Sequence, residues 1–376
     1  MASEETEVVV VGAGQAGVAM SEHLGAEGIP HIVLERHRIA ERWRTERWDS
    51  LVANGPAWHD RFPNLEFSDV APDAFASKEQ VADYFVAYAE KIGAPVRCGV
   101  EVTSVRNHEG RPGFRVETSE GSIDARFVVA ATGPFQRPVI PPIVSDGAVA
   151  TQIHSSGYRN PEQLPEGAVL VVGAGSSGVQ IADELRRAGR RVFLSVGPHD
   201  RPPREYRGRD FCWWLGVLGL WDLTTPPQGA AHVTIAVSGA HGGHTVDFRA
   251  LAGTGVELVG MTASYDGGVL RFAPDLVPAL AVPSRVELHL GCLARRPVHR
   301  RPHHADRTTR APLPLHPHRM PHDVIRRETG VIVRDAAHSL VLSPPLIMTE
   351  AEAKEVGSAL RGVLERTDAT GEIRPA

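Results

Sequence analysis

The feature that most constrains the fold is a glycine-rich turn near the start of the chain. Four valines at positions 8–11 lead directly into Gly12-Ala13-Gly14-Gln15-Ala16-Gly17, and an apolar helical stretch follows. This order predicts a strand, a tight turn and the opening of a helix. In such a unit Gly12 makes the turn, Gly14 lets the backbone approach a pyrophosphate, and Gly17 lets the helix pack closely on the strand. We therefore expect the loop, including Gln15 and Ala16, to bind a dinucleotide.

An acidic residue stands at the distance that such a site requires. The apolar run Ile32–Leu34 ends in Glu35, which follows Gly12 by 23 residues. A carboxylate at this position can accept hydrogen bonds from the ribose hydroxyls of an adenine dinucleotide. Strand, turn, helix and acid together favour a nucleotide site over an accidental glycine turn, and we assign Glu35 and the next residue, Arg36, to it.

The same pattern occurs a second time, 161 residues further along the chain. The run Val169–Val172 leads into a loop that contains Gly173, Gly175, Ser176, Ser177 and Gly178. The next expected strand, 191–196, includes Ser195 but no carboxylate, and Arg201 and Arg204 follow it. An acid would repel a 2′-phosphate and arginine would bind it, so this pattern favours NADPH over NADH. The alternative is that the two arginines form a solvated rim.

Composition limits the class of protein. A chain of 376 residues with 42% hydrophobic and 23% charged residues predicts a globular protein of about two domains. A net charge of −5 gives no overall attraction to nucleic acid or anionic membranes. The three cysteines are widely spaced and predict neither a disulfide framework nor a metal site, and the N-terminus is acidic, unlike a signal peptide. We expect a cytoplasmic protein with no transmembrane segment.

The region between the two loops contains several candidate site residues. Trp43 and Trp48 lie in a tryptophan-rich stretch that either packs on the first domain or forms a wall for a planar ring. Apolar residues over 78–91 follow the spacing of one buried helix face. A later strand ends in Ala131-Thr132-Gly133, which suits backbone that lies against a cofactor.

Residues 211–221 form an uncharged and strongly apolar stretch. It is shorter than the roughly 20 residues that span a bilayer. Three interpretations remain open for it, namely a buried helix, the lining of a substrate channel, and a membrane-surface contact.

These motifs resemble those of the flavoprotein monooxygenases that use FAD and NADPH, the group of flavin-containing monooxygenases and Baeyer–Villiger enzymes, over about residues 5–275. Both glycine loops and the Ala131–Gly133 strand end match. His154 and Tyr158 occupy the last two positions of the motif that this family carries between its loops, although alanines replace its phenylalanine and glycine. Asn54 lies close to the place where these enzymes have an asparagine near the reactive flavin carbon.

The resemblance implies an α/β fold with two Rossmann-like dinucleotide-binding domains of the three-layer ββα/βαβ type. An FAD-binding domain over 1–140 would receive an NADPH-binding domain over 141–277 as an insertion. The cofactors would be FAD and NADPH, and the enzyme would insert one oxygen atom from O2 into a small organic substrate, by N- or S-oxidation or by a Baeyer–Villiger reaction. The alternatives are a truncated or fused nucleotide-binding remnant with little activity and a plain NAD(P)H-flavin oxidoreductase.

The remainder of the chain differs in character. Residues 278–328 are rich in arginine, histidine and proline and predict an irregular linker, and their histidines fit no standard metal site. Residues 329–376 predict two strands and a helix, and they resemble the C-terminal end of a class III pyridoxal-phosphate aminotransferase without its upstream catalytic lysine. We find no segment after Asp275 that resembles the family's return to the FAD domain, so we expect that domain to lack its last strands.

Overall fold

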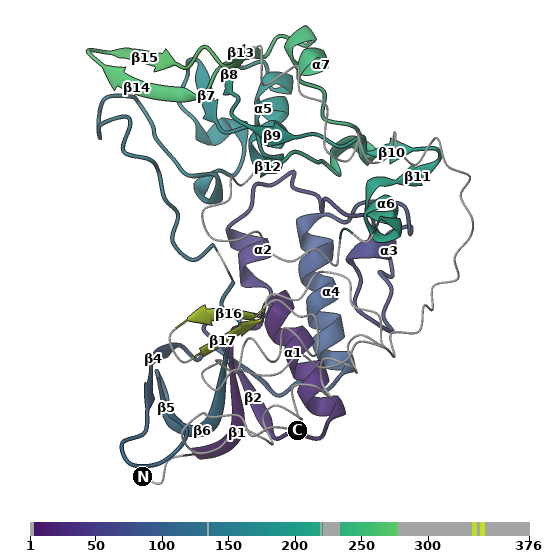
Figure 1. The fold of residues 1–376 in the computed structure, drawn as a ribbon, viewed down its shortest axis with the longest axis vertical. Coiled ribbons are helices and arrows are strands. Elements are labelled where there is room, and N and C mark those ends of the chain that lie inside the picture. Colours follow the sequence, from purple (N-terminus) through teal and green to yellow (C-terminus); the bar gives the residue numbers. More distant parts are fainter. Residues whose placement is uncertain are drawn as a thin grey trace, which may run out of the picture.

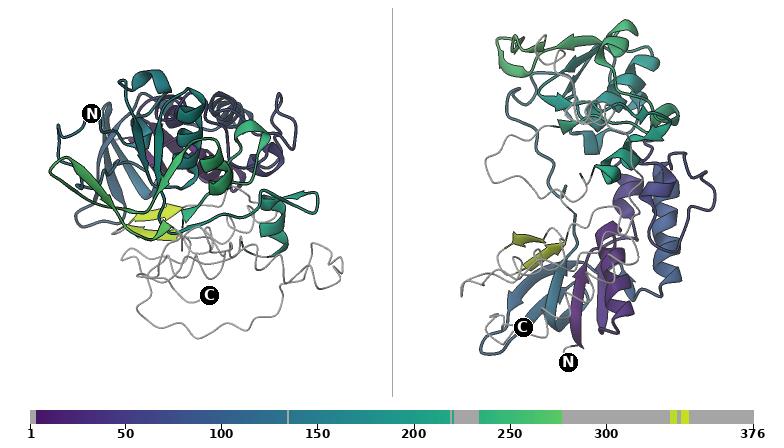
Figure 2. Two further views of the ribbon diagram at one scale, coloured as in Figure 1. Left: turned by 90° about the horizontal axis from the view of Figure 1, so that it is seen from above. Right: turned by 45° about the vertical axis from the view of Figure 1, so that its right-hand side comes forward.

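The computed structural model describes residues 4–133, 135–218, 220 and 234–276, together with the strands at 333–336 and 339–342. It has two lobes, each built on its own parallel sheet, as Figure 1 and the right-hand view of Figure 2 show. We call the part that contains β1 the first lobe and the part that contains β7 the second lobe. This arrangement confirms the predicted α/β fold with two Rossmann-like units.

The first lobe is organised on a sheet with the strand order β16-β17-β6-β1-β2-β3. Its parallel centre consists of β1 (Glu4–Val11), β2 (His31–Glu35), β3 (Val96–Cys98) and β6 (Gly121–Ala130). In the middle of the sheet Val10 pairs with Val33 on one side and with Val129 on the other. The valine run is therefore the buried central strand that its β-branched residues predict.

One layer packs on each face of this sheet. On one face α1 (Gln15–Ala26) packs through Met20 and Leu24 against Val8 and Val10. On the other face the antiparallel strands β4 (Val102–Asn107) and β5 (Phe114–Thr118) cover a separate apolar cluster that includes Val9. The alternation of valine side chains across the strand thus supplies both cores, because successive residues point to opposite faces.

A second helix layer covers α1. The helix α4 (Lys78–Lys91) begins at a capping box formed by Ser77 and Gln80, and its buried face carries the apolar positions expected over 78–91, which are Val81, Tyr84, Phe85 and Tyr88. The short helices α2 (Glu41–Thr45) and α3 (Ala57–Asp60) lie in the loop between β2 and α4.

The second lobe has the parallel strand order β13-β8-β7. These strands are β7 (Val169–Val172), β8 (Val192–Ser195) and β13 (Glu257–Val259), and the helices α5 (Ser176–Arg187) and α7 (Phe248–Gly253) pack with them. Smaller elements complete the lobe and its surroundings: the 3-10 turns η1 (Ser155–Gly157), η2 (Pro161–Gln163) and η4 (Ala240–Gly242), the strands β9 (His199–Asp200), β10 (Glu205–Tyr206), β11 (Arg209–Asp210), β12 (Thr234–Ile235), β14 (Thr262–Asp266) and β15 (Val269–Phe272), and the helix α6 (Phe211–Val217).

A strand pair that follows the second lobe in sequence joins the first sheet. This finding corrects the expectation that no segment after Asp275 returns to the first domain. The strands β16 (Val333–Ala336) and β17 (Ser339–Leu342) form an antiparallel pair, and β17 runs parallel to β6 with Leu340 opposite Val129. Two strands were predicted in this region, but not this partner. The first half of β6 pairs with β5, so its second half has a free edge that β17 occupies. The second lobe is therefore inserted between two neighbouring strands of the first.

Two other expectations lie outside the described residues, namely the linker over 278–328 and the helix after the last strand. Among the residues that the structure does describe, no helix is both long and apolar enough to cross a membrane.

Candidate functional site

The first glycine loop has the geometry of a phosphate cradle. Gly12 has a φ of +104°, and a Cβ atom there would lie 2.7 Å from the carbonyl oxygen of Ala131. A Cβ atom on Gly17 would lie 1.8 Å from the carbonyl oxygen of Gly12, whereas one on Gly14 would have no atom within 4 Å. The outer glycines are thus required by the fold, while the central one faces open space through which a ligand can approach.

The helix that follows presents its amino end to this space. Gly14 is the N-cap of α1, and no side chain caps the first turn. The first N–H groups of a helix have no partner within it and, together with the helix dipole, favour an anion. Loop and helix therefore fit a dinucleotide pyrophosphate, with Gln15 and Ala16 in the first turn.

Glu35 lies beside the same loop. Its carboxylate accepts a hydrogen bond from the backbone N–H of Ala13 at 2.9 Å and another from that of His37 at 3.0 Å. These two bonds hold the side chain at the end of β2, where it fits a ribose hydroxyl. Arg36 follows with an exposed side chain.

The strand end 131–133 forms the neighbouring edge of this site. The N–H of Ala131 donates to the carbonyl oxygen of Val11 at 2.9 Å, so this residue continues the pairing of β6 with β1. Thr132 and Gly133 are exposed, and Gly133 has a φ of +81°. The backbone therefore leaves the sheet next to the glycine loop, and its contact with a cofactor stays a prediction.

The second loop repeats the geometry of the first. Gly173 has a φ of +98°, and a Cβ atom on Gly178 would lie 1.9 Å from the carbonyl oxygen of Gly173. Gly175 is the N-cap of α5 and no side chain caps the turn. The hydroxyl of Ser176 accepts a hydrogen bond from the N–H of Val237 at 3.2 Å, and Ser177 is exposed. A second phosphate can therefore approach the amino end of α5.

Ser195 lies away from that opening. Its side chain is 2% exposed, and its hydroxyl donates to the carbonyl oxygen of Gly260 at 2.9 Å while it accepts from the N–H of Thr262 at 3.0 Å. These bonds tie β8 to the segment after β13. The structure therefore gives Ser195 a role in packing, which corrects its assignment to cofactor binding.

The two arginines proposed for the 2′-phosphate have different surroundings. Arg204 is 4% exposed, forms an ion pair with Asp210 at 2.8 Å and lies over the ring of Phe75 at 4.5 Å. Because its charge is already paired inside the protein, the assignment of Arg204 to a phosphate is corrected. Arg201 is half-buried, with its guanidinium 5.2 Å from the centre of the Phe248 ring.

Trp43 and Trp48 also differ in their surroundings. Trp48 is 4% exposed and packs in the hydrophobic cluster of the second lobe. Trp43 is half-buried, meets the edge of Phe85 with ring centres 6.4 Å apart, and lines a cavity. The packing interpretation thus fits Trp48, and the wall interpretation fits Trp43.

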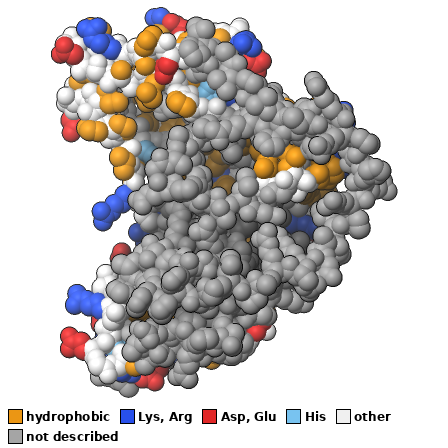
Figure 3. Space-filling view, viewed as in Figure 1, with side chains coloured by type: hydrophobic (Ala, Val, Ile, Leu, Met, Phe, Trp, Pro, Cys, Tyr) orange, Lys and Arg blue, Asp and Glu red, His pale blue; other side chains and the backbone are white. Residues whose placement is uncertain are grey.

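That cavity has a volume of about 260 Å³ and is mainly apolar. Its lining joins the tryptophan-rich region and α4 of the first lobe to α6: Trp43, Ala53, Asn54, Gly55, His59, Asp60, Phe67, Val81, Phe85, Phe211, Cys212 and Val237. Figure 3 shows hydrophobic side chains gathered at the position that α6 has in Figure 1. Of the three interpretations of the apolar stretch 211–221, its described part therefore supports both a partly buried helix and a cavity lining.

Three titratable side chains face this cavity, and sequence analysis did not identify them. Burial raises the pKa of Asp60 to about 6, although the N–H of Gly55 donates to its carboxylate at 3.2 Å. Burial also lowers the pKa of His59 to about 4 and raises the pKa of the Cys212 thiol. A histidine and a carboxylate inside the apolar stretch 55–62 were the sequence signal that could have identified two of them.

Asn54 connects the cavity to the second lobe. Its side-chain oxygen accepts a hydrogen bond from Nε2 of Gln180 on α5 at 2.8 Å. Its backbone oxygen accepts another from Nη1 of Arg204 at 2.5 Å. The predicted catalytic residue thus lies in the cavity wall and is held from both its side chain and its backbone.

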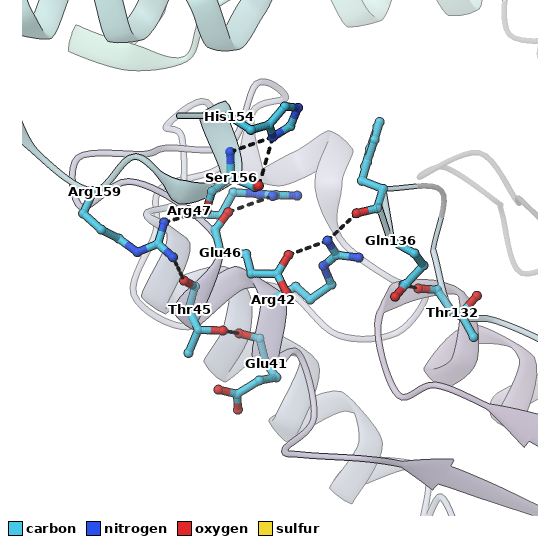
Figure 4. A network of polar contacts seen from close by, with 11 residues as sticks. Glu41, Arg42, Thr45, Glu46, Arg47, Thr132, Gln136, His154, Ser156 and Arg159 are labelled. Carbon is cyan, nitrogen blue, oxygen red and sulfur yellow. Dashed lines mark hydrogen bonds and ion pairs between the residues drawn. The ribbon is translucent and has the colours of Figure 1, made fainter. Parts of the chain in front are cut away.

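Figure 4 shows a polar network between α2 and two parts of the connection from β6 to β7. Arg42 donates to the carbonyl oxygen of Phe135 and pairs with Glu46. Arg159 donates to the carbonyl oxygens of Thr45 and, at 2.7 Å, Ser156. The network braces this connection against the first lobe.

His154 belongs to this network through a local contact. Its Nδ1 accepts a hydrogen bond from the N–H of Ser156 at 3.1 Å and so caps η1. Tyr158, the other residue of the motif between the loops, is 2% exposed and donates from its hydroxyl to Glu184 on α5 at 2.6 Å. Tyr158 thus positions the connecting segment against the second lobe, while His154 orders the turn before it.

Comparisons with known proteins agree with this geometry. A family model described as pyridine nucleotide-disulphide oxidoreductase matches residues 9–207. An uncharacterized CzcO-like oxidoreductase of Geobacillus kaustophilus is 42% identical over 220 residues, which are 58% of this chain and 62% of that protein. The indole-3-pyruvate monooxygenase YUCCA1 of Oryza sativa subsp. japonica is 34% identical over 191 residues, 50% of this chain and 47% of that protein. The chain therefore spans less than two thirds of the length of these relatives.

A solved structure shares the fold. A variant of a flavin monooxygenase from Stenotrophomonas maltophilia superimposes with a TM-score of 0.56 at 22% identity, over 72% of this chain and 74% of that one. The likeness supports the fold of two lobes, each with its own sheet.

The raised pKa of Asp60 predicts a pH-dependent effect of Asp60→Asn. Between the ordinary pKa of 3.8 and about 6 the native state binds more protons at this site than the unfolded state, so the stability that the carboxyl contributes is lost as pH rises through this window. The free energy of unfolding of the variant, relative to the original protein, should therefore increase from pH 4 to 7 by up to about 3 kcal/mol. Denaturant titrations at a series of pH values measure this difference.

Nε2 of His59 lies 3.8 Å from the Asp60 carboxylate, so the same comparison in a His59→Gln background separates its titration from that of Asp60. Asp83→Asn, at an exposed carboxylate paired with Arg44, is the control for the loss of a carboxylate. A difference between Asp60→Asn and the original protein that does not change with pH would contradict the burial of this charge.

Proposed function

The chain belongs to the pyridine nucleotide-disulphide oxidoreductase family, and from this premise we propose that it is an FAD-dependent oxidoreductase of the monooxygenase type that uses NADPH. The observation that carries the proposal has two parts. Each lobe has a glycine loop whose first glycine has a positive φ and whose last glycine is packed against the carbonyl oxygen of the first, and the wall of a cavity is hydrogen-bonded to the helix of the second loop. In the proposed enzyme, two dinucleotides bind one chain and their reactive ends meet near that cavity.

FAD is assigned to the first loop. The open space at Gly14 and the uncapped end of α1 would receive the pyrophosphate, and the carboxylate of Glu35 would accept the ribose hydroxyls. The exposed backbone of Thr132 and Gly133 would lie along the cofactor. When bound, FAD accepts hydride from NADPH and activates O2 for transfer of one oxygen atom to the substrate.

NADPH is assigned to the second loop, over Gly173, Gly175, Ser176, Ser177 and Gly178. Of the two arginines first proposed for the 2′-phosphate, we retain Arg201, which follows β8 and lies over the ring of Phe248, whereas Arg204 is buried in an ion pair with Asp210. The apolar cavity would keep water from the reacting atoms, and its wall includes Asn54 as the proposed catalytic residue.

The cavity indicates the size and charge of the substrate. A cavity of about 150 Å³ can hold benzene, so one of about 260 Å³ accommodates a small bicyclic molecule. No lysine or arginine is among the described residues that line it, and Asp60 adds a carboxyl group. We therefore propose a small organic substrate without an anionic group, oxidised at nitrogen or sulfur or by a Baeyer–Villiger reaction.

We propose a cytoplasmic location for the enzyme. Both cysteines in the described residues, Cys98 and Cys212, are free thiols, as expected in a reducing compartment.

The products of NADPH oxidation test the type of reaction. FAD-loaded protein should oxidise NADPH in the presence of O2 and convert an amine, a sulfide or a ketone into a product with one additional oxygen atom, measured by mass spectrometry with ¹⁸O2. NADPH oxidation that yields only hydrogen peroxide with all three substrate types would indicate a plain NAD(P)H-flavin oxidoreductase. Protein that takes up no FAD and oxidises no NADPH would instead be a nucleotide-binding remnant.

The glycine loop predicts contrasting effects of two equal substitutions. Gly14→Ala adds a methyl group toward open space, so the fold should persist while the dissociation constant of FAD rises by at least roughly tenfold. Gly17→Ala places its methyl group 1.8 Å from the carbonyl oxygen of Gly12 and should reduce the free energy of unfolding by roughly 1–3 kcal/mol or more.

Flavin fluorescence and thermal unfolding of the two variants separate these effects. If Gly14→Ala and the original protein bind FAD with equal affinity, the pyrophosphate does not bind at Gly14.

Arg201→Ala tests the second nucleotide. If this guanidinium binds the 2′-phosphate, the KM for NADPH should rise roughly tenfold and the KM for NADH should stay the same. Arg191→Ala, which removes an exposed arginine paired with Glu257, is the matched control. Equal changes with both nucleotides would argue against recognition of the 2′-phosphate by Arg201.

A further inference from the structure

One face of α5 reaches back into the loop that forms the cavity wall. Gln180 and Glu184 are one helical turn apart and therefore lie on the same face. Nε2 of Gln180 donates to Oδ1 of Asn54 at 2.8 Å, and Glu184 accepts from the hydroxyl of Ser50 at 2.6 Å. The helix that begins at the second glycine loop thus contacts residues 50–54 of the first lobe at two points.

The backbone and the side chain of Asn54 are held by different residues. Nη1 of Arg204 donates to its backbone oxygen, and the position of Arg204 is itself set by Asp210. Gln180 contacts only the carboxamide. The backbone of Asn54 is therefore held without Gln180. The hydrogen bond from Gln180 instead fixes the orientation of the Asn54 carboxamide.

The orientation of this carboxamide decides which atom faces the cavity. Its oxygen and nitrogen ends are nearly equal in size, but one accepts hydrogen bonds and the other donates them. With Oδ1 bonded to Gln180, Nδ2 remains, and it makes no hydrogen bond to any residue within the described part of the chain. Asn54 therefore offers an N–H donor to a ligand in the cavity.

Gln180 is well suited to set this orientation. It is 7% exposed, and a buried amide that loses its hydrogen-bond partner is strongly disfavoured. It also lies in the second turn of α5, close to the uncapped end at Gly175. A phosphate bound at that end would restrain the helix and, through Gln180, the side chain of Asn54.

We propose that Gln180 is a positioning residue that turns the amide N–H of Asn54 toward the cavity and thereby links occupancy of the second glycine loop to the geometry of the cavity wall. This inference rests on the proposed function, because it takes the second loop as the NADPH site and the cavity as the place of oxygen transfer. It adds a residue of the second lobe to the machinery of the cavity.

The test compares Gln180→Met, which keeps the length of the side chain and removes the donor, with Asn54→Ala and the double variant. Arg187→Met on the exposed side of α5 is the matched control. The first readout needs no turnover: the dissociation constant of NADP⁺ is measured by calorimetry with and without FAD. The ratio of the two constants should move toward one in Gln180→Met and Asn54→Ala and stay at its original value in Arg187→Met.

The second readout is the fraction of oxidised NADPH that appears as hydrogen peroxide. It should rise several-fold in Gln180→Met, with FAD affinity within twofold of the original, and the double variant should be no worse than Asn54→Ala. Non-additivity shows that Gln180 acts through Asn54, which a general packing role would not produce. Additive effects, or a peroxide fraction and a NADP⁺ ratio that do not change, would overturn the proposal.

A failure of the proposed function would be recognised separately in the original protein, which would then either bind no FAD or release all of the oxidised NADPH as hydrogen peroxide. In that case the melting temperatures of the four variants, measured without nucleotide, test whether the Asn54–Gln180 hydrogen bond is present. Shifts of Gln180→Met and Asn54→Ala that are not additive support the Asn54–Gln180 bond, and additive shifts refute it.

Discussion

The close approach of a helix to the strand before it is the constraint on which both lobes depend. At Gly17 and Gly178 the space for a side chain is taken by a carbonyl oxygen of the preceding turn, 1.8 and 1.9 Å from where a Cβ would lie. This approach places the amino ends of α1 and α5 at the carboxyl ends of the strands that precede them. The affinity for phosphate groups is therefore a property of backbone packing, and side chains add selectivity to it.

Selectivity and chemistry arise where the two lobes meet. Asn54 belongs to a loop of the first lobe, yet its carboxamide is bonded to α5 and its backbone to Arg204, both of the later chain. Asp60 and His59 are buried against α6, which also follows the second loop in sequence. A cavity assembled from both halves in this way changes shape when the lobes move. The contacts of Asn54 with the later chain would therefore respond both to the proposed hydride donor and to the proposed substrate.

Site residues were predicted correctly where they depend on neighbours close in the sequence, and they were missed or misassigned where they depend on distant segments. The glycine loops, Glu35 and the apolar face of α4 depend on neighbours within one strand–helix unit, so spacing in the sequence was sufficient to predict them. Arg204 and Ser195 were misassigned because Asp210 and Thr262 occupy their polar groups. His59 and Asp60 escaped notice because their burial requires α6, more than 100 residues later. The return of β17 to β6 could not be predicted from a segment that does not resemble the family's own.

The position of β17 has a consequence for how the chain is made. Leu340 pairs with Val129 at a sequence separation of 211 residues, so this edge of the second half of β6 stays unpaired by β17 until the residues of β17 have been synthesised. Contacts of such long sequence separation form late, and exposed strand edges are the sites at which incomplete chains associate with one another. During synthesis the first lobe would thus expose this strand edge for as long as the inserted lobe takes to be translated.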